Sequence, residues 1–372
     1  MKPLSFVAAR YTQYVGASIL FISLLYSPSW VLAICVIDGM GDNGSIDVLT
    51  RHLGKGCSVT DRETYAVKAD ELLEALKIGR SLDLSGVIIV GDLSLDQLPL
   101  TPVAVSELPS PSIQEAVRTK SLTELRQVSG SISIRNSIVR GVIRTGLKEG
   151  FLLAKGPVIM SGTVFEQAVD FSRTAFLGQV DFSQARLLQQ GYFIQALFNQ
   201  PARFERTVFG PHTRFHRAVF SARSTFVEAD FSGLAEFLEV KFEKDADFAR
   251  TSFKMGTGFS GSHFNGGLDF SDAIFERELY FLFTVFEKNV SFRRAIFRGQ
   301  ADFSDAQFKG VDDFSGTFFR VEPVFARAKF SANPPSIGKE HDIAKGYDFR
   351  VFYGLATMVM ICTVVLVFIL NR

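Results

Sequence analysis

Phenylalanine recurs in this chain at intervals that alternate between five and six residues, and no other feature constrains the fold as strongly. From Phe165 to Phe330 the alternating walk visits 31 positions, and each is phenylalanine except Leu187. The whole chain holds 38 phenylalanines beside 8 tyrosines and 1 tryptophan, so one structural slot accounts for most of them. The sequence therefore consists, over this stretch, of eleven-residue internal repeats.

The walk defines the predicted structural core. Its members are Phe165, Phe171, Phe176, Phe182, Leu187, Phe193, Phe198, Phe204, Phe209, Phe215, Phe220, Phe226, Phe231, Phe237, Phe242, Phe248, Phe253, Phe259, Phe264, Phe270, Phe275, Phe281, Phe286, Phe292, Phe297, Phe303, Phe308, Phe314, Phe319, Phe325 and Phe330.

Neither a helix nor a flat strand accommodates this spacing. Five residues advance a helix by about 140°, which would split the rings into two stripes, and Pro201, Pro211 and Pro323 would break such a rod. In a strand an odd interval sends successive rings to opposite faces. A chain that turns a corner every five or six residues fits, because each short side then aims one ring at a common axis. Coils stacked about 4.8 Å apart would share backbone hydrogen bonds.

The residue two positions before every second ring tests this interpretation. A square interior has room for one large group per side, so this neighbour must be small. From Thr174 to Ala328 the position holds only Ala, Ser, Thr or Val. The pattern therefore predicts a closed coil with four sides.

Segments such as AVDFS (168–172), LDFSDAIF (268–275) and GQADFSDAQF (299–308) resemble the pentapeptide-repeat family. The resemblance is strong over residues 158–333 and weak over 81–95 and 131–143. It implies an all-β solenoid, the right-handed quadrilateral β-helix. The extra residue in each eleven departs from the strict five-residue motif and predicts 22-residue coils with two widened corners.

Residues 1–33 have the pattern of a secretory signal peptide. Lys2 and Arg10 precede an apolar run, and the small-residue stretch SPSWVLA ends at Ala33. An uncleaved signal anchor is the alternative, because Val31 to Ile37 extends the apolar run. The segment LAIC (32–35) also approaches a lipoprotein signal, although Ile34 stands where a small residue is needed.

Residues 351–370 contain 20 residues without a charge, which is the length needed to cross a bilayer core. They predict a C-terminal transmembrane helix, joined to the repeats (158–333) by a linker at 334–350. Export of the chain would place its bulk on the extracytoplasmic side.

Cys35 and Cys57 are expected to form a disulfide if the chain is exported. If Cys35 is lipidated or removed with the leader, Cys57 is left alone. Cys362 lies inside the predicted span and serves as an apolar filler.

Between the leader and the repeats, the N-terminal segment 34–80 is predicted to contain a capping helix at 61–78. Thr60 and Glu63 suggest a capping box, and Gly79 a stop. Residues 81–157 are expected to form irregular first coils, interrupted by a proline-rich insertion at 99–112.

The sequence predicts no catalytic residue, cofactor or metal site. His212 and His216 have a metal-ligand spacing for a helix but need not converge on a square coil, so no metal site is expected there. Six of the aspartates that directly precede core rings are expected to stack on outer faces, where they help form the turns; acid–base or calcium chemistry is the alternative. They are Asp170, Asp181, Asp247, Asp269, Asp302 and Asp313.

The balanced charge, 40 Lys and Arg against 39 Asp and Glu, argues against a nucleic-acid binder. These features predict a non-catalytic, membrane-anchored scaffold that binds an unidentified protein. One alternative is a DNA-mimicking inhibitor of topoisomerase, as some members of the family are, but that role requires an acidic cytosolic chain. The other is a sensor subunit of a membrane complex.

Overall fold

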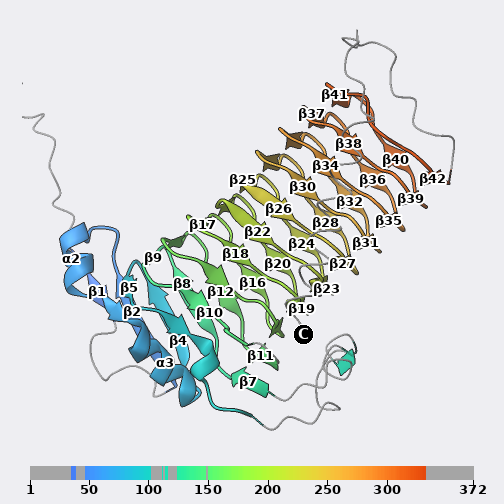
Figure 1. The fold of residues 1–372 in the computed structure, drawn as a ribbon. Coiled ribbons are helices and arrows are strands. Elements are labelled where there is room, and N and C mark those ends of the chain that lie inside the picture. Colours follow the sequence, from blue (N-terminus) through green and yellow to red (C-terminus); the bar gives the residue numbers. More distant parts are fainter. Residues whose placement is uncertain are drawn as a thin grey trace, which may run out of the picture.

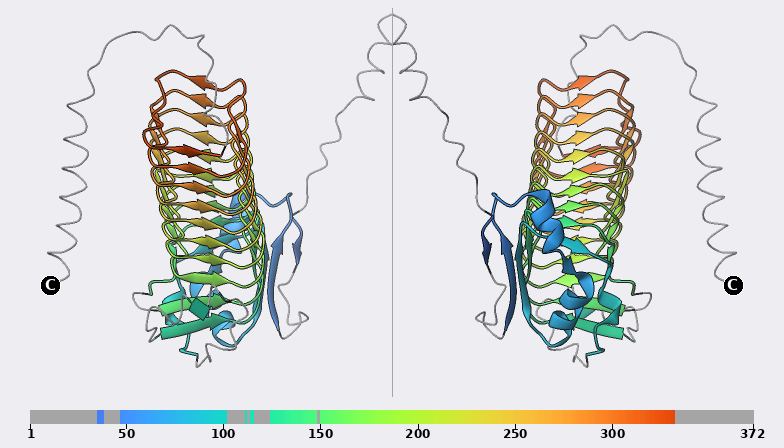
Figure 2. Two further views of the ribbon diagram at one scale, coloured as in Figure 1. Left: turned by 90° about the vertical axis from the view of Figure 1, so that its right-hand side faces the viewer. Right: turned by 90° about the vertical axis from the view of Figure 1, so that its left-hand side faces the viewer.

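The computed structural model describes residues 35–38, 47–101, 111, 114–115, 124–147 and 150–331. These residues form a right-handed all-β solenoid of about 11 turns (Figure 1). Four sheets, here called faces A to D, run along the rod, and their strands are parallel except for β1, which is antiparallel to β2. From β4 onward the chain visits the faces in that order. Figure 2 shows the coils stacked as rungs of a single rod.

Face A contains β1 (Ile37–Asp38), β2 (Val48–Leu53), β4 (Ser81–Ser85), β8 (Ile132–Arg135), β12 (Val158–Ile159), β16 (Val180–Asp181), β20 (Ala202–Arg203), β24 (Ser224–Thr225), β28 (Ala246–Asp247), β32 (Leu268–Asp269), β36 (Val290–Ser291) and β40 (Asp312–Asp313). Face B contains β3 (Val67–Lys68), β5 (Ile88–Val90), β9 (Ile138–Val139), β13 (Val164–Phe165), β17 (Arg186–Leu187), β21 (Val208–Phe209), β25 (Asp230–Phe231), β29 (Ser252–Phe253), β33 (Ile274–Phe275), β37 (Ile296–Phe297) and β41 (Phe318–Phe319).

Face C contains β6 (Leu93–Ser94), β10 (Ile143–Arg144), β14 (Val169–Asp170), β18 (Gly191–Tyr192), β22 (His212–Arg214), β26 (Leu234–Glu236), β30 (Thr257–Gly258), β34 (Leu279–Tyr280) and β38 (Ala301–Asp302). Face D contains β7 (Glu124–Val128), β11 (Gly150–Ala154), β15 (Thr174–Phe176), β19 (Leu197–Phe198), β23 (Val219–Phe220), β27 (Lys241–Phe242), β31 (His263–Phe264), β35 (Val285–Phe286), β39 (Gln307–Phe308) and β42 (Lys329–Phe330).

The register confirms the predicted 22-residue coil. Val180 pairs with Ala202, and Ala202 pairs with Ser224, so the chain returns to face A after each coil of the predicted length. The six-residue intervals fall at the corners between faces B and C and between faces D and A, which are the two widened corners. Backbone hydrogen bonds join successive coils, as from Phe204 N to the Thr225 carbonyl at 2.8 Å.

The interior is filled by stacked rings. Phe198 lies 4.4 Å from Phe220 between ring centroids with an interplanar angle of 2°, and the same parallel stacking repeats along all four faces. The predicted core residues are buried, Leu187 included, up to the last coil. There Phe314, Phe325 and Phe330 are half-buried because they lie in the final coil of the described residues.

The first coils are longer, as the sequence predicts for 81–157. Leu82 pairs with Ile132, so a single coil runs from one to the other and contains the proline-rich insertion between β6 and β7. Ile132 pairs with Val158, which leaves four extra residues in the next coil. A 3₁₀ helix, η1 (Leu95–Gln97), follows β6.

The prediction of one helix at 61–78 is wrong. In this segment the chain forms two helices, α2 (Val59–Thr64) and α3 (Ala69–Lys77), separated by β3. The helix is interrupted because Val67 pairs with Ile89 and commits its backbone to face B. The capping box is made by Ser58 and Asp61, not by Thr60 and Glu63.

Helix α3 alone caps the rod. It takes the place of the face C and face D strands in the first coil and packs against β3, β4 and β6. Its buried residues are Ala69, Leu72, Leu73, Ala75 and Leu76. Gly79, with φ of 82°, follows its C-terminus, as predicted for the stop.

A disulfide joins Cys35 and Cys57, which lie on either side of the antiparallel pair β1 and β2. No helix of the described residues is long and apolar enough to span a bilayer. The predicted leader at 1–33 and the predicted span at 351–370 lie outside the described residues.

Candidate interaction surface

The tight corners, between faces A and B and between faces C and D, determine which side chains face outward. Two residues after the ring, the chain adopts a positive φ, as at Gln184 (60°), and Ala185 N then donates to the Phe182 carbonyl at 2.9 Å. A positive φ at the third residue of a four-residue turn is typical of type II turns. These left-handed residues recur every eleven positions and form two rows along the rod.

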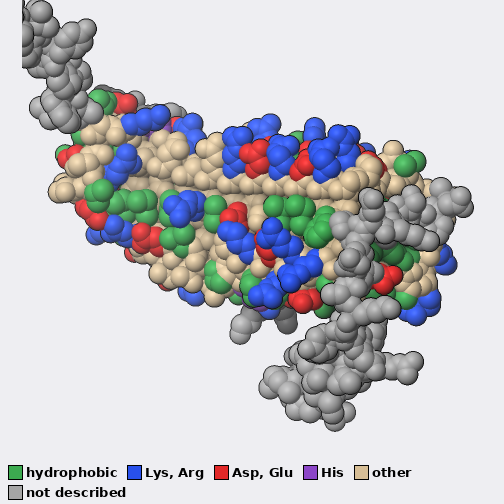
Figure 3. All heavy atoms as spheres, turned by 90° about the horizontal axis from the view of Figure 1, so that it is seen from above, with side chains coloured by type: hydrophobic (Ala, Val, Ile, Leu, Met, Phe, Trp, Pro, Cys, Tyr) green, Lys and Arg blue, Asp and Glu red, His purple; other side chains and the backbone are tan. Residues whose placement is uncertain are grey.

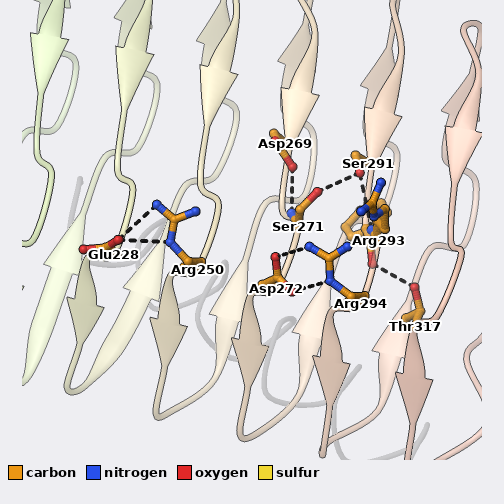
Figure 4. A network of polar contacts seen from close by, with 10 residues as sticks. Glu228, Arg250, Asp269, Ser271, Asp272, Ser291, Arg293, Arg294 and Thr317 are labelled. Atoms are coloured by element: carbon orange, nitrogen blue, oxygen red, sulfur yellow. Dashed lines mark hydrogen bonds and ion pairs between the residues drawn. The ribbon is translucent and has the colours of Figure 1, made fainter.

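The row between faces A and B carries charges of alternating sign. Glu228 accepts hydrogen bonds from Arg206 at 2.6 Å and from Arg250 at 3.0 Å. Further along, Asp272 accepts two from Arg294, at 2.7 and 2.6 Å (Figure 4). Hydrogen bonds from Arg206 and Arg250 hold the pKa of Glu228 below its usual range. Figure 3 shows such rows of mixed sign along one side of the rod.

Six of the aspartates that directly precede core rings help form the turns, as predicted. Each accepts a hydrogen bond from the backbone N–H two residues later, for example Asp269 from Ser271 at 2.7 Å. Asp247 and Asp269 are paired in register on face A, so these side chains do stack. Among the described residues, no group of three His, Cys, Asp or Glu could hold a metal ion.

A square coil does not require His212 and His216 to converge, but both approach Glu236 of the next coil on face C. The Glu236 carboxylate lies 2.7 Å from His212 Nε2 and 3.5 Å from His216 Nε2. It also accepts from Arg214 Nε at 2.7 Å. His216, followed by His212 and Arg214, lowers the pKa of Glu236 to about 2 against the effect of burial. An ionised carboxylate held in this way stabilises the surface of the coil.

An open hollow of about 450 Å³ lies at the widened corner between faces D and A, at the coils that contain β27, β31 and β35. Lys244 and Lys288 line it together with Glu243, Asp245 and Gly266. The hollow is lined by charges of both signs and by no histidine or cysteine.

Face C also carries an apolar stretch. Leu234, Met255, Tyr280 and Phe283 are exposed by 39%, 49%, 44% and 65%. They belong to three successive coils, at face C and its two corners. None of these four residues belongs to a catalytic or metal-binding motif, so the sequence did not predict them as a site. Phe283 nevertheless carries a signal in the sequence, because it is a phenylalanine that lies outside the five–six walk.

Comparison with protein families supports the repeat assignment. The family model described as pentapeptide repeats (9 copies) matches residues 160–208, 226–274, 248–296 and 270–317. Comparison with curated proteins found no match, and comparison with solved structures found none. The matched residues form coils with one buried ring on each of four sides. Residues 160–208 and 226–317 of the chain are therefore pentapeptide repeats.

Proposed function

We propose that this chain is a non-catalytic scaffold, anchored in a membrane and extracytoplasmic, that presents the faces of its rod to a partner protein. One observation carries the proposal: the interior of the coil is filled by stacked phenylalanine rings from Phe165 to Phe308. A filled interior leaves only the outer faces for recognition. A rigid rod suits recognition, because little ordering entropy is lost when a partner binds.

The sequence pattern at the two ends supports anchoring. Residues 1–33 have the pattern of a secretory leader, and residues 351–370 have the length and apolarity of a membrane span. A linker at 334–350 would keep the C-terminal end of the rod close to the bilayer, because a chain of this length reaches at most about 60 Å.

The charge distribution argues against the DNA-mimicking alternative. A DNA mimic needs a face that is uniformly acidic, but the row of Arg206, Glu228 and Arg250 alternates in sign and is internally paired. The whole chain is also close to neutral. A surface of this kind suits contact with a protein more than imitation of a polyanion.

Two measurements in cells test the proposal. For topology, a Leu188→Cys variant should react with a membrane-impermeant maleimide in intact cells, since Leu188 is 42% exposed. A chain ending at residue 350 should leave the membrane fraction.

For the scaffold role, proximity labelling from the full chain should enrich a reproducible protein partner over an untethered labelling enzyme. Labelling of Leu188→Cys only after lysis would refute the extracytoplasmic location. Membrane retention of the truncated chain would refute the C-terminal anchor, and the absence of an enriched protein would refute the scaffold role.

A further inference from the structure

One coil of face C lacks the outward side chains that its neighbours carry. Gly256, Gly258 and Gly261, here called the glycine strip, occupy positions filled by Leu234, Glu236 and Glu239 in the coil before. In the coil after, the same positions hold Glu278, Tyr280 and Phe283. The glycine strip therefore has no side chains of its own between two coils with large ones, but side chains of the coil before lie over it. A Cβ on Gly256 would be 3.5 Å from Leu234 Cδ1, and a Cβ on Gly261 would be 3.3 Å from Glu239 Cγ. Leu238 also lies over the glycine strip, because a Cβ on Gly258 would be 3.0 Å from Leu238 Cδ2.

Apolar side chains border the glycine strip on both sides. Leu234 precedes it, Met255 lies at its start, and Tyr280 and Phe283 follow it, all of them 39% to 65% exposed. We call these four residues the apolar border. Scattered exposed apolar residues are ordinary, but a group of them on three successive coils is typical of a protein-binding surface.

The requirements of the fold do not explain why phenylalanine occupies position 283. Its φ is 56°, in the left-handed region, and its side chain is 65% exposed. The other coils place Arg, Gln, Glu, Asp or Gly at this corner. A bulky residue with positive φ is uncommon, and an exposed ring gains little from burial. Glycine or asparagine would serve the turn better, so the ring is present for a contact outside the coil.

Negative charge without a paired cation lies next to Tyr280. Burial, together with the carboxylates of Glu278 and Asp302, raises the pKa of Tyr280. Within the part of the chain that the structure describes, neither carboxylate forms a salt bridge, whereas Glu236 and Glu239 on the other side of the glycine strip are paired with arginines. The exposed cation nearest in sequence is Arg277, at the neighbouring widened corner. The carboxylates of Glu278 and Asp302, next to Tyr280, could therefore pair with cations of a bound partner.

We propose that the glycine strip and apolar border bind an extended segment of a partner protein that combines apolar side chains with lysine or arginine. This inference rests on the proposed scaffold function and names its binding face. Leu238, which lies over the glycine strip, adds apolar surface there. Phe283, Met255 and Leu234 contact its apolar side chains, and Glu278 and Asp302 pair with its cations.

A defined peptide tests the chemistry. The purified full chain is titrated with fluorescein-labelled GSKLFRLSG, and anisotropy is measured at two salt concentrations. Saturable binding that weakens with salt is expected, because the ion pairs are exposed. The acidic peptide GSELFDLSG and the polar peptide GSKSSRSSG should bind at least tenfold more weakly.

Variants assign the binding to this face. Phe283→Asn should lower the affinity at least tenfold while the melting temperature stays equal or rises, since asparagine accepts a positive φ. The double variant Glu278→Gln/Asp302→Asn should lower the affinity and reduce its dependence on salt. Arg277→Gln is the matched control and should bind the basic peptide as the wild type does.

Three results would overturn the inference: no saturable binding of the basic peptide, equal or preferred binding of the acidic one, or unchanged binding by Phe283→Asn. A sedimentation coefficient that shows self-association of the wild type and not of Phe283→Asn would also overturn it, because a second copy would then be the occupant. If proximity labelling still recovers the same partner with Phe283→Asn, the scaffold function stands and only this face is excluded.

Discussion

A phenylalanine in the middle of the rod touches rings in the coils on both sides. Phe259 is fully buried and stacks on Phe237 at 4.7 Å and on Phe281 at 5.0 Å between centroids. Hydrogen bonds between coils fix their spacing, so the surroundings cannot collapse into the space of a lost ring. Phe259→Ala should therefore lower the free energy of unfolding by about 3–5 kcal/mol in urea denaturation. The control Leu188→Ala, at an exposed corner, should change it by less than about 1 kcal/mol; similar losses for both variants would contradict this account of the core.

The tight corners restrict which residues fit there, because one residue in each has a positive φ. Gln184 has a φ of 60° and a side chain in solvent. A β-branched residue fits this backbone poorly, so Gln184→Val should cost about 1–2 kcal/mol. Gln184→Gly should be neutral or stabilising at the same position. Both variants lose the glutamine side chain, so a difference between their melting temperatures reports backbone strain alone. Equal melting temperatures would exclude strain as the cause.

At this scale the sequence predicted the core well, because one repeated slot determines it. Leu187 was assigned correctly from its place in the walk alone, and the structure buries it. The convergence of His212 and His216 on Glu236 was missed, since it depends on side chains that meet across two coils. Phe283 could have been found by asking which phenylalanines the walk leaves unexplained.

At the scale of elements, the N-terminal cap shows where periodicity alone is insufficient. An apolar stripe from Ala66 to Leu76 fits one helix, and the sequence contains no breaker within it. The structure instead uses Val67 in face B, because a parallel partner, β5, is available beside it. Local pattern predicted α3 correctly but could not predict this competition, which depends on the position of a later strand.

The elements β22 and β26 together carry the strongest pH dependence expected of the rod. Glu236 has a pKa of about 2 in the folded chain and an ordinary value of 4.5. Between these values the unfolded chain takes up a proton that the folded chain does not, so stability should fall as the pH is lowered from about 4.5 to 2. Glu236→Gln should flatten the plot of unfolding free energy against pH in this window. Leu188→Ala should run parallel to the wild type, and an equal slope in Glu236→Gln would assign the acid sensitivity to other groups.

At the scale of the molecule, the period of eleven residues is half a coil, and this explains why the fold could be predicted so fully. Each turn contains a widened and a tight corner twice over, so opposite faces have the same spacing between rings. The long first coils were less predictable, because an insertion between β6 and β7 changes the loop and leaves the register of Leu82 with Ile132 intact. The sequence therefore determines where rings point, while the length of a given loop is free to vary.

This symmetry leads to a prediction for the whole rod. Deleting residues 290–311 removes one complete coil and restores every face and corner, because Leu268 would then pair with Asp312 as it now pairs with Val290. In a repeat protein each coil contacts only its neighbours, so the shortened chain should fold with a modest loss of stability. Deleting only 290–295 removes a single side of the coil and places a tight corner where a widened one is required. The first deletion should keep the β-rich circular dichroism and one cooperative melt and shorten the rod by about 4.8 Å in X-ray scattering, whereas the second should lose the cooperative melt. If both deletions melt alike, the alternation of corners does not set the register, and the coil must be held by the rings alone.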